Sequence, residues 1–347
     1  MADFCTLFDS NYLARGMALY QSLQRVCSSF HLYVVTFDQS CFDFLQQADL
    51  QNLTAIRLED FEDQQLLAVK PGRKRSEYCW TCTPSVILYC IEKFKLPACT
   101  YLDADMIFYQ DPQVLIDEDP DCAVLITSHR YTTVYDQSAT HGTYCVQFMY
   151  FRKDPDGLLA LRWWRDRCLE WCYDYQEDGK FGDQKYLDDW TKRFKRVHEL
   201  AHLGGGVAPW NLQQYEPIEA PGQLQIVNRK TGERYPLVFF HFHGLTFYTD
   251  NRFTCTGTMY RISTPYKNLI YFPYVKRLLE LSVEIRSQGF AGDPNGASRP
   301  APSKWEAFRQ FSTERLILLL KGKFMPYQLE QFDFSKHFHI SQNPTIN

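Results

Sequence analysis

Residues 101–112 read YLDADMIFYQDP, and this stretch decides the fold because an apolar strand ends there in two carboxylates. The residues at 99–103 (CTYLD) have the apolar and aromatic character of a buried strand. Asp103 and Asp105 flank Ala104, and side chains two positions apart on a strand point to the same side. We therefore expect two carboxylates side by side at the end of a central strand.

Strand and helix patterns alternate on both sides of this stretch. Buried strands are predicted at residues 3–8, 30–37, 53–58, 122–127 and 144–151. Apolar residues recur at helical spacing from Leu13 to Leu23, and a second helix is expected near 84–94, after a basic loop at 70–75. This order predicts an α/β fold with a mixed, mostly parallel sheet and helices on both faces. Ligands of such sheets bind at the carboxyl ends of the strands.

The later part of the chain has longer helical segments, and its character changes near residue 250. Helices are predicted at 154–176, from about Asp183, at 269–286 and at 304–321, and a strand is predicted at 236–242. Residues 288–303 (QGFAGDPNGASRPAPS) have the composition of a linker or loop. We predict an α/β domain at 1–250 and a mainly helical C-terminal extension at 251–347.

Composition and charge limit the classes of function. The formal net charge of −4 argues against a general nucleic-acid-binding surface. The N-terminal residues show no signal peptide, and no apolar run approaches the roughly 18 residues that cross a membrane. We therefore expect a cytoplasmic protein whose twelve cysteines are mostly free thiols. Aromatic residues make up 16% of the chain, which suits either a cleft that stacks on sugars and bases or a large aromatic core.

The two carboxylates suit a hard divalent cation. Mn²⁺ and Mg²⁺ prefer oxygen ligands, and a site with few protein ligands leaves positions for phosphate oxygens. A cation there would neutralise a diphosphate leaving group as its negative charge grows. Short acidic motifs are also common in solvated turns, so Asp103 and Asp105 alone do not establish a site.

Four segments together resemble one enzyme family. The segment at 101–112 resembles the strand and metal motif of glycosyltransferases with the GT-A fold, particularly the glycogenin-like retaining enzymes of family eight. Three further segments match that family in order: LFDSNYLARGMALYQSL at 7–23, GDQKYLDD at 182–189 and HFHG at 241–244. The matching motifs span residues 3–248, and the ordered set is more specific than any single motif.

The resemblance assigns nucleotide binding to the opening strand and helix. In that family the residues matching Asn11 and Tyr12 hold the base and stack on it. The backbone near Phe8 and Asp9 pairs with uracil. The donor that the resemblance implies is a nucleotide-diphosphate sugar, namely a UDP-sugar.

The metal ligands follow from the same resemblance. The first histidine of the family's HxxG motif is its third protein metal ligand. This assigns Mn²⁺ or Mg²⁺ to Asp103, Asp105 and His241, with His243 as a second choice for the histidine. Ala104 and His243 are expected to contribute to the donor site beside the ion.

The transferred sugar is assigned to the Asp-Gln motif, which here is Asp183 and Gln184. These two residues are expected to contact the sugar and to stabilise its positively charged, oxocarbenium-like ring. The resemblance implies retention, with the acceptor hydroxyl attacking on the leaving-group face. Inversion would instead need a carboxylate base within hydrogen-bond reach of the acceptor, and Asp136, Asp183 and Asp188 are candidates.

Two segments depart from the family's pattern. The family follows HxxG with a Lys-Pro-Trp that grips phosphate, whereas residues 245–247 read LTF. The family also has Asn-Ser/Ala-Gly in the strand that reads YCVQ at 144–147. The candidates for a replacement phosphate-binding cation are Lys70, Arg73, Lys74 and Arg75. A solvated run of charges is the alternative interpretation of this basic loop.

Two pairs of residues outside the motifs are further candidates for the cleft. His129 and Arg130 follow a predicted strand and are expected either to reach the cleft or to be structural. Trp210 and Asn211 follow the glycines at 204–206, which we expect to be flexible. They form either a sugar-binding wall or part of the core.

The combined prediction is a metal-dependent transfer of a hexose-type sugar to a glycan, lipid-linked or other acceptor, in polysaccharide or glycoconjugate synthesis. The apolar and basic residues at 311–323 either contact the inner face of a membrane or pack on the domain. The alternatives on this fold are a non-catalytic nucleotide-sugar- or carbohydrate-binding protein and a nucleotide-sugar hydrolase. A sugar-phosphate nucleotidylyltransferase would need a glycine-rich loop after the first strand, and residues 9–12 (DSNY) contain no glycine.

Overall fold

The computed structural model describes residues 1–303, 305–306, 309 and 330–338 of the chain. The predicted last helix at 304–321 and the apolar and basic residues at 311–323 therefore lie almost entirely outside the described residues. Among the described residues, no helix combines the length and the apolar character that crossing a membrane requires.

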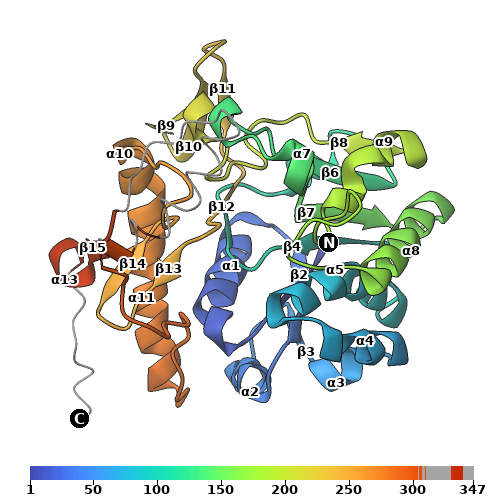
Figure 1. Ribbon diagram of the computed structural model, residues 1–347, viewed down its shortest axis with the longest axis horizontal. Coiled ribbons are helices and arrows are strands. Elements are labelled where there is room, and N and C mark those ends of the chain that lie inside the picture. Colours follow the sequence, from blue (N-terminus) through green and yellow to red (C-terminus); the bar gives the residue numbers. More distant parts are fainter. Residues whose placement is uncertain (304, 307–308, 310–329, 339–347) are drawn as a thin grey trace.

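A seven-stranded sheet forms the centre of the molecule (Figure 1). In their order across the sheet, the strands are β3 (Leu53–Arg57), β2 (Phe30–Thr36), β1 (Ala2–Phe8), β4 (Ala98–Leu102), β7 (Tyr144–Arg152), β6 (Val124–Ser128) and β8 (Val197–Glu199). Strand β7 is antiparallel to both of its neighbours, and the other pairs are parallel. This confirms the predicted mixed, mostly parallel sheet of the GT-A fold.

Helices cover both faces of the sheet (Figure 1). One apolar layer contains α1 (Leu13–Val26), α2 (Gln39–Ala48) and α11 (Phe272–Ser287). The opposite layer contains α3 (Leu58–Phe61), α4 (Gln64–Val69), α5 (Arg75–Lys93) and α8 (Pro155–Glu170). The short helices elsewhere are α6 (Gln113–Ile116), α7 (Ser138–His141), α9 (Trp190–Arg193), α10 (Thr264–Tyr266) and α13 (Phe334–His337).

The predicted start of the helix at 84–94 and the predicted end of the helix at 154–176 were wrong. Helix α5 begins at Arg75, and the side chain of Glu77 accepts a hydrogen bond of 2.7 Å from the backbone N–H of Lys74. The sequence favours a later start because proline is common in the first turn of a helix, whereas Pro84 lies inside this one. Helix α8 ends at Glu170, six residues before the predicted end, because the next residue adopts an extended backbone.

The predicted strand at 236–242 is two strands that join different sheets. Strand β11 (Arg234–Pro236) pairs with β10 (Gln223–Asn228), which pairs in turn with β9 (Tyr215–Ala220). Strand β12 (Phe239–His241) pairs in antiparallel fashion with β5 (Met106–Phe108). In that pairing His241 lies opposite Met106, one residue after Asp105. The break in the strand therefore brings the HxxG segment to the acidic motif.

The C-terminal described part packs on the same core. The helix predicted at 269–286 begins earlier, with α10 and a π-helical turn at Lys267–Tyr271 leading into α11. A small sheet joins β13 (Thr246–Phe247), β14 (Arg252–Thr254) and β15 (Phe332–Asp333). The loop at 288–303 contacts the domain directly, because the carbonyl of Pro294 accepts a hydrogen bond from the N–H of Ala14.

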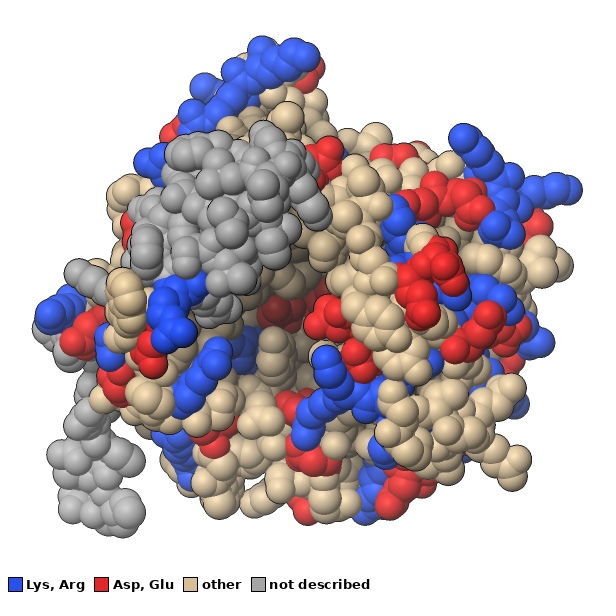
Figure 2. Space-filling view, viewed as in Figure 1, with Lys and Arg blue, Asp and Glu red and all other residues tan. Residues whose placement is uncertain are grey.

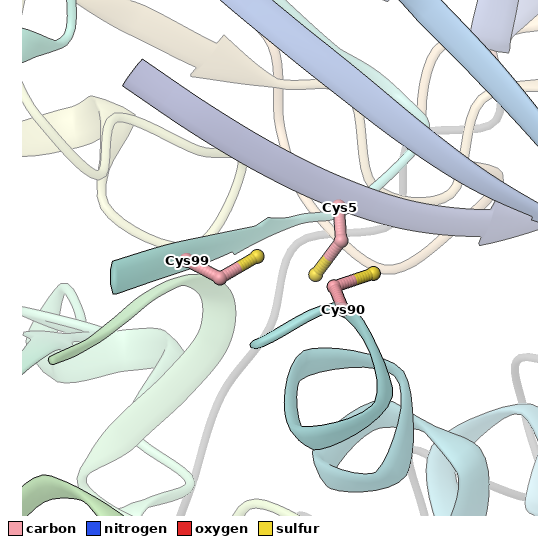
Figure 3. A group of neighbouring side chains, drawn as sticks. All are labelled: Cys5, Cys90 and Cys99. Atoms are coloured by element: carbon pink, nitrogen blue, oxygen red, sulfur yellow. The ribbon is translucent and has the colours of Figure 1, made fainter. Parts of the chain in front are cut away.

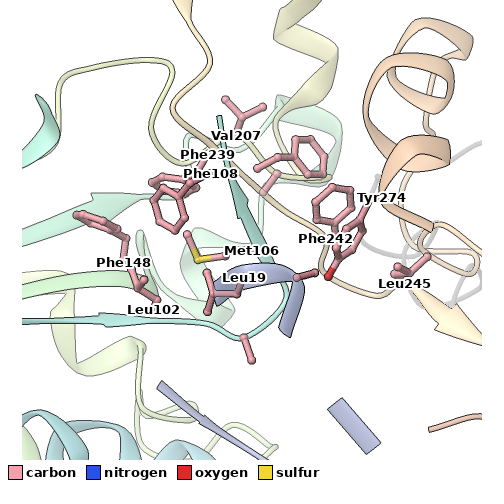
Figure 4. Close-up of a cluster of buried hydrophobic side chains, with 14 of the residues drawn as sticks. Leu19, Leu102, Met106, Phe108, Phe148, Val207, Phe239, Phe242, Leu245 and Tyr274 are labelled. Atoms are coloured by element: carbon pink, nitrogen blue, oxygen red, sulfur yellow. The ribbon is translucent and has the colours of Figure 1, made fainter. Parts of the chain in front are cut away.

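An aromatic cluster fixes the ribbon formed by β5 and β12 against the main sheet (Figure 4). Phe239 on β12 lies with its ring centroid 5.5 Å from the rings of both Phe108 on β5 and Phe148 on β7. All three side chains are fully buried. Each stabilises the fold by roughly 1.5–3 kcal/mol, so the position of the ribbon is strongly determined.

Three buried thiols meet in the opposite layer of the core (Figure 3). Cys5 on β1, Cys90 on α5 and Cys99 on β4 have sulfur atoms within 4.8 Å of one another. They are surrounded by the apolar side chains that pack α5 on the sheet. All twelve cysteines of the chain are free, as predicted for most of them.

Candidate functional site

A cavity of about 1490 Å³ opens at the carboxyl edge of the sheet. The residues that directly follow three parallel strands line it: Asp9 after β1, Asp103 after β4 and His129 after β6. Figure 2 shows a hollow near the middle of one face of the molecule, with acidic groups at its floor and basic groups along its lower edge. Ligand pockets commonly measure about 300–1,000 Å³, so this cavity has room for more than one small molecule.

The structure brings Asp103, Asp105 and His241 together at the floor of this cavity. Each offers one ligand atom, and the three atoms lie within 4.8 Å of one another. The imidazole Nε2 of His241 is 3.1 Å from Asp105 Oδ1 and 3.7 Å from Asp103 Oδ2. Ala104 and His243 also line the cavity. The predicted convergence of the two carboxylates and the imidazole is therefore observed.

Backbone hydrogen bonds hold these three residues in place. The N–H of Asp103 donates to the carbonyl of Gln147, which extends the pairing of β4 with β7 by one residue. The carbonyl of Asp105 accepts from the N–H of Phe242 at 2.9 Å. The N–H of His241 donates to the carbonyl of Val207 at 3.0 Å. The ligand atoms are consequently attached to paired backbone segments.

The two carboxylates and the histidine at the floor of the cavity shift one another's pKa values. Burial raises the pKa of Asp103, and the neighbouring carboxylate of Asp105 raises it further. Burial also disfavours the charged form of Asp105, but the positive charge of His241 outweighs this effect and lowers the pKa of Asp105. The same pairing raises the pKa of His241 well above its ordinary value, against the effect of burial. The histidine is thus the counter-charge for two carboxylates.

Asp183 and Gln184 both line the cavity. The side chain of Asp183 is buried, and its backbone carbonyl accepts a hydrogen bond from the indole N–H of Trp164. Burial first, and then the charge of Asp103, raise the pKa of Asp183 to about 8. The side-chain amide of Gln184 donates a hydrogen bond of 2.7 Å to the backbone carbonyl of His141, and this bond orients the Gln184 side chain.

The predicted nucleotide-binding residues are only partly at the cavity. Phe8, Asp9 and Tyr12 line it, but Asn11 does not. The backbone N–H and the side-chain amide of Asn11 both donate to the carboxylate of Asp9. That carboxylate also forms an ion pair with Arg75. Asn11 therefore stabilises the loop after β1 through its hydrogen bonds to Asp9, outside the cavity.

The structure separates the four basic residues that were candidates for phosphate binding. Lys74 and Arg75, at the start of α5, line the cavity. Lys70 instead pairs with Glu62 at 2.6 Å. Arg73 places its guanidinium over the ring of Tyr173, 3.8 Å from the ring centroid. Only two of the four candidates therefore face the cavity.

In each of the two pairs of candidates outside the motifs, one residue lines the cavity and the other does not. His129 and Trp210 line the cavity and contact each other edge to face. Arg130 turns away and donates to the carbonyl of Gly205. The side chain of Asn211 is fully buried and donates to the carbonyls of His129 and Gly206. Asn211 and Arg130 are therefore structural.

The glycines at 204–206 are buried and close-packed, so the expectation that they are flexible was wrong. A Cβ atom at Gly204 would lie 1.8 Å from the carbonyl oxygen of Pro236. Gly206 has a φ of +85° and packs against Thr127 and Arg130. Glycine is needed here because other segments approach its backbone too closely for a side chain.

An aromatic wall of the cavity was missed by the sequence analysis. Its members are Trp80, Tyr131, Tyr135, Tyr175, Phe181 and Tyr260. These residues come from segments far apart in the chain and form no local motif. The high aromatic content was the one signal available, and it fits a large core equally well.

The mixed, mostly parallel sheet with helices on both faces is the fold that the sequence predicts, and the cavity lies at the carboxyl edge of this sheet. No protein-family model matches the chain. The chain is 30% identical over 292 residues to the uncharacterized protein YfnD of Bacillus subtilis (strain 168), and the match covers 82% of this chain and 91% of YfnD. It is 29% identical over 299 residues to YfnF of the same organism. The chain belongs to the family of YfnD.

Solved structures with a similar fold are glycosyltransferases. The galactosyltransferase LgtC, in complex with donor and acceptor sugar analogs, is 14% identical with a TM-score of 0.42, over 69% of this chain and 86% of LgtC. The glycosyltransferase GlyE of Streptococcus pneumoniae TIGR4 is 15% identical with a TM-score of 0.46, over 87% of this chain and 66% of GlyE. Similarity at this level carries no information about substrate or mechanism.

Proposed function

We propose that this chain is a metal-dependent glycosyltransferase that moves a hexose-type sugar from a UDP-sugar to a glycan or lipid-linked acceptor with retention of configuration. The observation that carries the proposal is the convergence of Asp103, Asp105 and His241 at the floor of one large cavity. The resemblance of four ordered motifs to family eight supplies the reaction class.

The three side chains fit a divalent cation such as Mn²⁺ or Mg²⁺. Two carboxylate oxygens and one imidazole nitrogen form a donor set of hard and borderline ligands, suited to Mn²⁺ or Mg²⁺. His241 now supplies the charge that balances the two carboxylates, and a cation would take over this role. When bound, the ion stabilises the negative charge of the departing diphosphate.

The residues around the triad provide a place for each part of the donor. Tyr12 presents an exposed ring for the base, and Phe8 and Asp9 line the cavity beside it, where the resemblance places uracil. Lys74 and Arg75 replace the missing Lys-Pro-Trp clamp and hold the phosphates. Charge-assisted hydrogen bonds of this kind are stronger than neutral ones.

Asp183 is suited to binding the sugar because its buried carboxyl group lines the cavity near Asp103. Burial raises its pKa, whereas a cation bound at Asp103 would oppose the further rise that the charge of Asp103 causes. Asp188 does not line the cavity and pairs with Lys185. Asp136 does line it and, like Asp183, remains a candidate base for an inverting reaction. The aromatic wall stacks on the acceptor.

A direct assay tests this proposal. The purified protein is incubated with Mn²⁺ and each of a panel of UDP-, GDP- and ADP-sugars, with and without candidate glycan acceptors, and the products are identified by mass spectrometry. Transfer that needs Mn²⁺ supports the proposal, and NMR of the product determines the anomeric configuration. Release of free sugar with every acceptor would indicate a hydrolase, and binding without turnover would indicate a binding protein.

A further inference from the structure

Gln147 contacts two of the three proposed metal ligands, although it does not line the cavity. It lies on β7, between β4 and β6 in the sheet, and its side chain is fully buried. Its backbone carbonyl accepts the N–H of Asp103 at 3.1 Å. Its side-chain Oε1 lies 2.8 Å from Nδ1 of His241. One residue therefore connects the ligand that directly follows β4 with the ligand on β12.

The contact with His241 determines which ring nitrogen can bind a cation. An amide oxygen only accepts hydrogen bonds, so Oε1 of Gln147 requires a proton on Nδ1 of His241. When a cation replaces the proton on Nε2, the imidazole becomes neutral, keeps its one N–H on Nδ1 and has its lone pair on Nε2, which faces Asp103 and Asp105. The opposite tautomer would point an N–H at the place where the cation binds.

Packing alone does not explain a glutamine at this position. Within the described residues, Nε2 of Gln147 is buried and has no hydrogen-bond partner. A buried donor without a partner destabilises the folded chain. An apolar side chain of similar volume would avoid this cost. The contribution of Gln147 is therefore to be sought in its oxygen, which faces the histidine.

We propose that Gln147 is a positioning residue that fixes His241 in the tautomer and orientation that bind the divalent cation through Nε2. This inference rests on the proposed function, because it assumes that a cation binds at the triad. Metal-ligating histidines usually donate their second N–H to an acceptor, and loss of that acceptor costs roughly 10- to 100-fold in metal affinity. In the sequence, YCVQ at 144–147 is distinguished only as a departure from the family's pattern.

The test compares Mn²⁺ affinity, measured by EPR of free Mn²⁺, in the wild type and three variants. Gln147→Met keeps the volume but removes the acceptor, and should weaken Mn²⁺ binding by roughly 10- to 100-fold. Gln147→Glu keeps an acceptor for Nδ1–H and should retain binding close to that of the wild type. The matched control is Thr127→Val on β6, which removes a buried hydrogen bond to the carbonyl of Phe148 and should leave Mn²⁺ affinity unchanged.

A second readout separates positioning from stability. In the Mg²⁺-loaded wild type, ¹⁵N NMR of labelled histidines should show the proton of His241 on Nδ1, with the resonance assigned by His241→Asn. In Gln147→Met the two tautomers should mix, while the melting temperature stays level or rises because the unpartnered amide is gone.

The possible outcomes distinguish the two proposals. Wild-type affinity in Gln147→Met, or equal weakening in the Met and Glu variants, would overturn the role of Gln147 and leave the metal site intact. A wild-type protein that binds no Mn²⁺ would instead overturn the proposed function, and the role of Gln147 with it. Weak binding in the Met variant together with rescue in the Glu variant supports the inference.

Discussion

The part of the chain that the structure describes contains two clusters of potential metal ligands, each with its ligand atoms within 4.8 Å of one another, and the two differ in their surroundings. Asp103, Asp105 and His241 meet at the floor of a cavity. The second cluster consists of the thiols of Cys5, Cys90 and Cys99, which have the same 4.8 Å limit on their separations but lie between a helix and the sheet. Closeness of ligand atoms is therefore not what distinguishes a site.

The difference lies in access and in charge. All three residues of the acidic cluster line the cavity and would hold an ion within reach of a ligand there, whereas none of the three thiols lines it. Burial raises the pKa of Cys5 and Cys99 well above the ordinary value for a thiol, whereas at Cys90 burial is outweighed by hydrogen bonds from these two thiols, which lower its pKa to about 6. Removing an uncompensated charge from water is costly, and buried cysteines otherwise pack as small apolar side chains. We interpret the thiols as part of the core.

The largest expected effect comes from removing a carboxylate of the acidic cluster. Asp105→Ala should abolish Mn²⁺ binding and sugar transfer while leaving the fold intact. Turnover should fall by more than the roughly 100- to 1,000-fold loss that follows removal of one transition-state hydrogen-bond donor. Turnover with Mn²⁺ and the far-UV circular dichroism spectrum measure both parts of this prediction. The control is Asp117→Ala, outside the cavity. Near-normal turnover in Asp105→Ala would contradict the metal assignment.

The next effect concerns the cations at the rim of the cavity. Lys74→Met should weaken binding of a UDP-sugar by roughly 10- to 100-fold, because a hydrogen bond to a charged group contributes about 1.5–3 kcal/mol. Isothermal titration calorimetry measures this affinity. Lys70→Met is the matched control, since Lys70 pairs with Glu62 and does not line the cavity. Equal losses of UDP-sugar affinity in the two variants would show that the net positive charge of the loop, and not the position of Lys74 at the cavity, determines binding.

The sequence predicted the sheet and the acidic pair because both depend on local patterns. Apolar runs identify β1, β2, β3, β4, β6 and β7 within a few residues, and the i, i+2 spacing places Asp103 with Asp105. The position of His241 came from the motif resemblance. In the structure, His241 reaches the acidic pair because the chain breaks after β11 and β12 then pairs with β5. No local pattern in the sequence indicates that break.

What the sequence could not predict depends on contacts between distant segments. Pro84 inside α5 made a later start of this helix look favourable. The helix in fact begins at Arg75, where the Glu77 side chain accepts a hydrogen bond from the backbone N–H of Lys74. The glycines at 204–206 looked flexible because their close neighbours, such as Pro236, are distant in the chain. Gln147 and the aromatic wall gained their roles in the same way. Such features follow from packing, which periodicity does not encode.

A third prediction uses the contrast between two histidines of the site. His241 has a raised pKa, whereas burial lowers the pKa of His129 to about 3. The unfolded chain takes up a proton on His129 below about pH 6.5, but the folded chain does so only near pH 3. The contribution of this histidine to stability therefore falls as the pH drops between these values, by up to roughly 1.4 kcal/mol per pH unit.

The comparison of the wild type with His129→Gln isolates this effect. Asp3 and Asp183 have the opposite effect on the pH dependence of stability. Burial raises their pKa values to about 6 and about 8, so the folded chain takes up protons on them before the unfolded chain does, and their contribution to stability increases as the pH falls. Urea unfolding at pH 7.5 and pH 5 should show a wild-type stability that drops more steeply toward acid than that of the variant. Parallel curves would mean that His129 is protonated in the folded protein.

The smallest effect is expected in the thiol cluster and tests the comparison most directly. Cys99→Ala should lower the free energy of unfolding by about 1 kcal/mol, because it leaves a small cavity beside Cys5 and Cys90. Mn²⁺ affinity and turnover should not change, because the thiols lie outside the cavity. Metal analysis of the purified wild type and variant completes the test. Stoichiometric zinc or copper in the wild type that is lost in Cys99→Ala would show that the buried thiols bind a metal after all, and access would then not distinguish the two clusters.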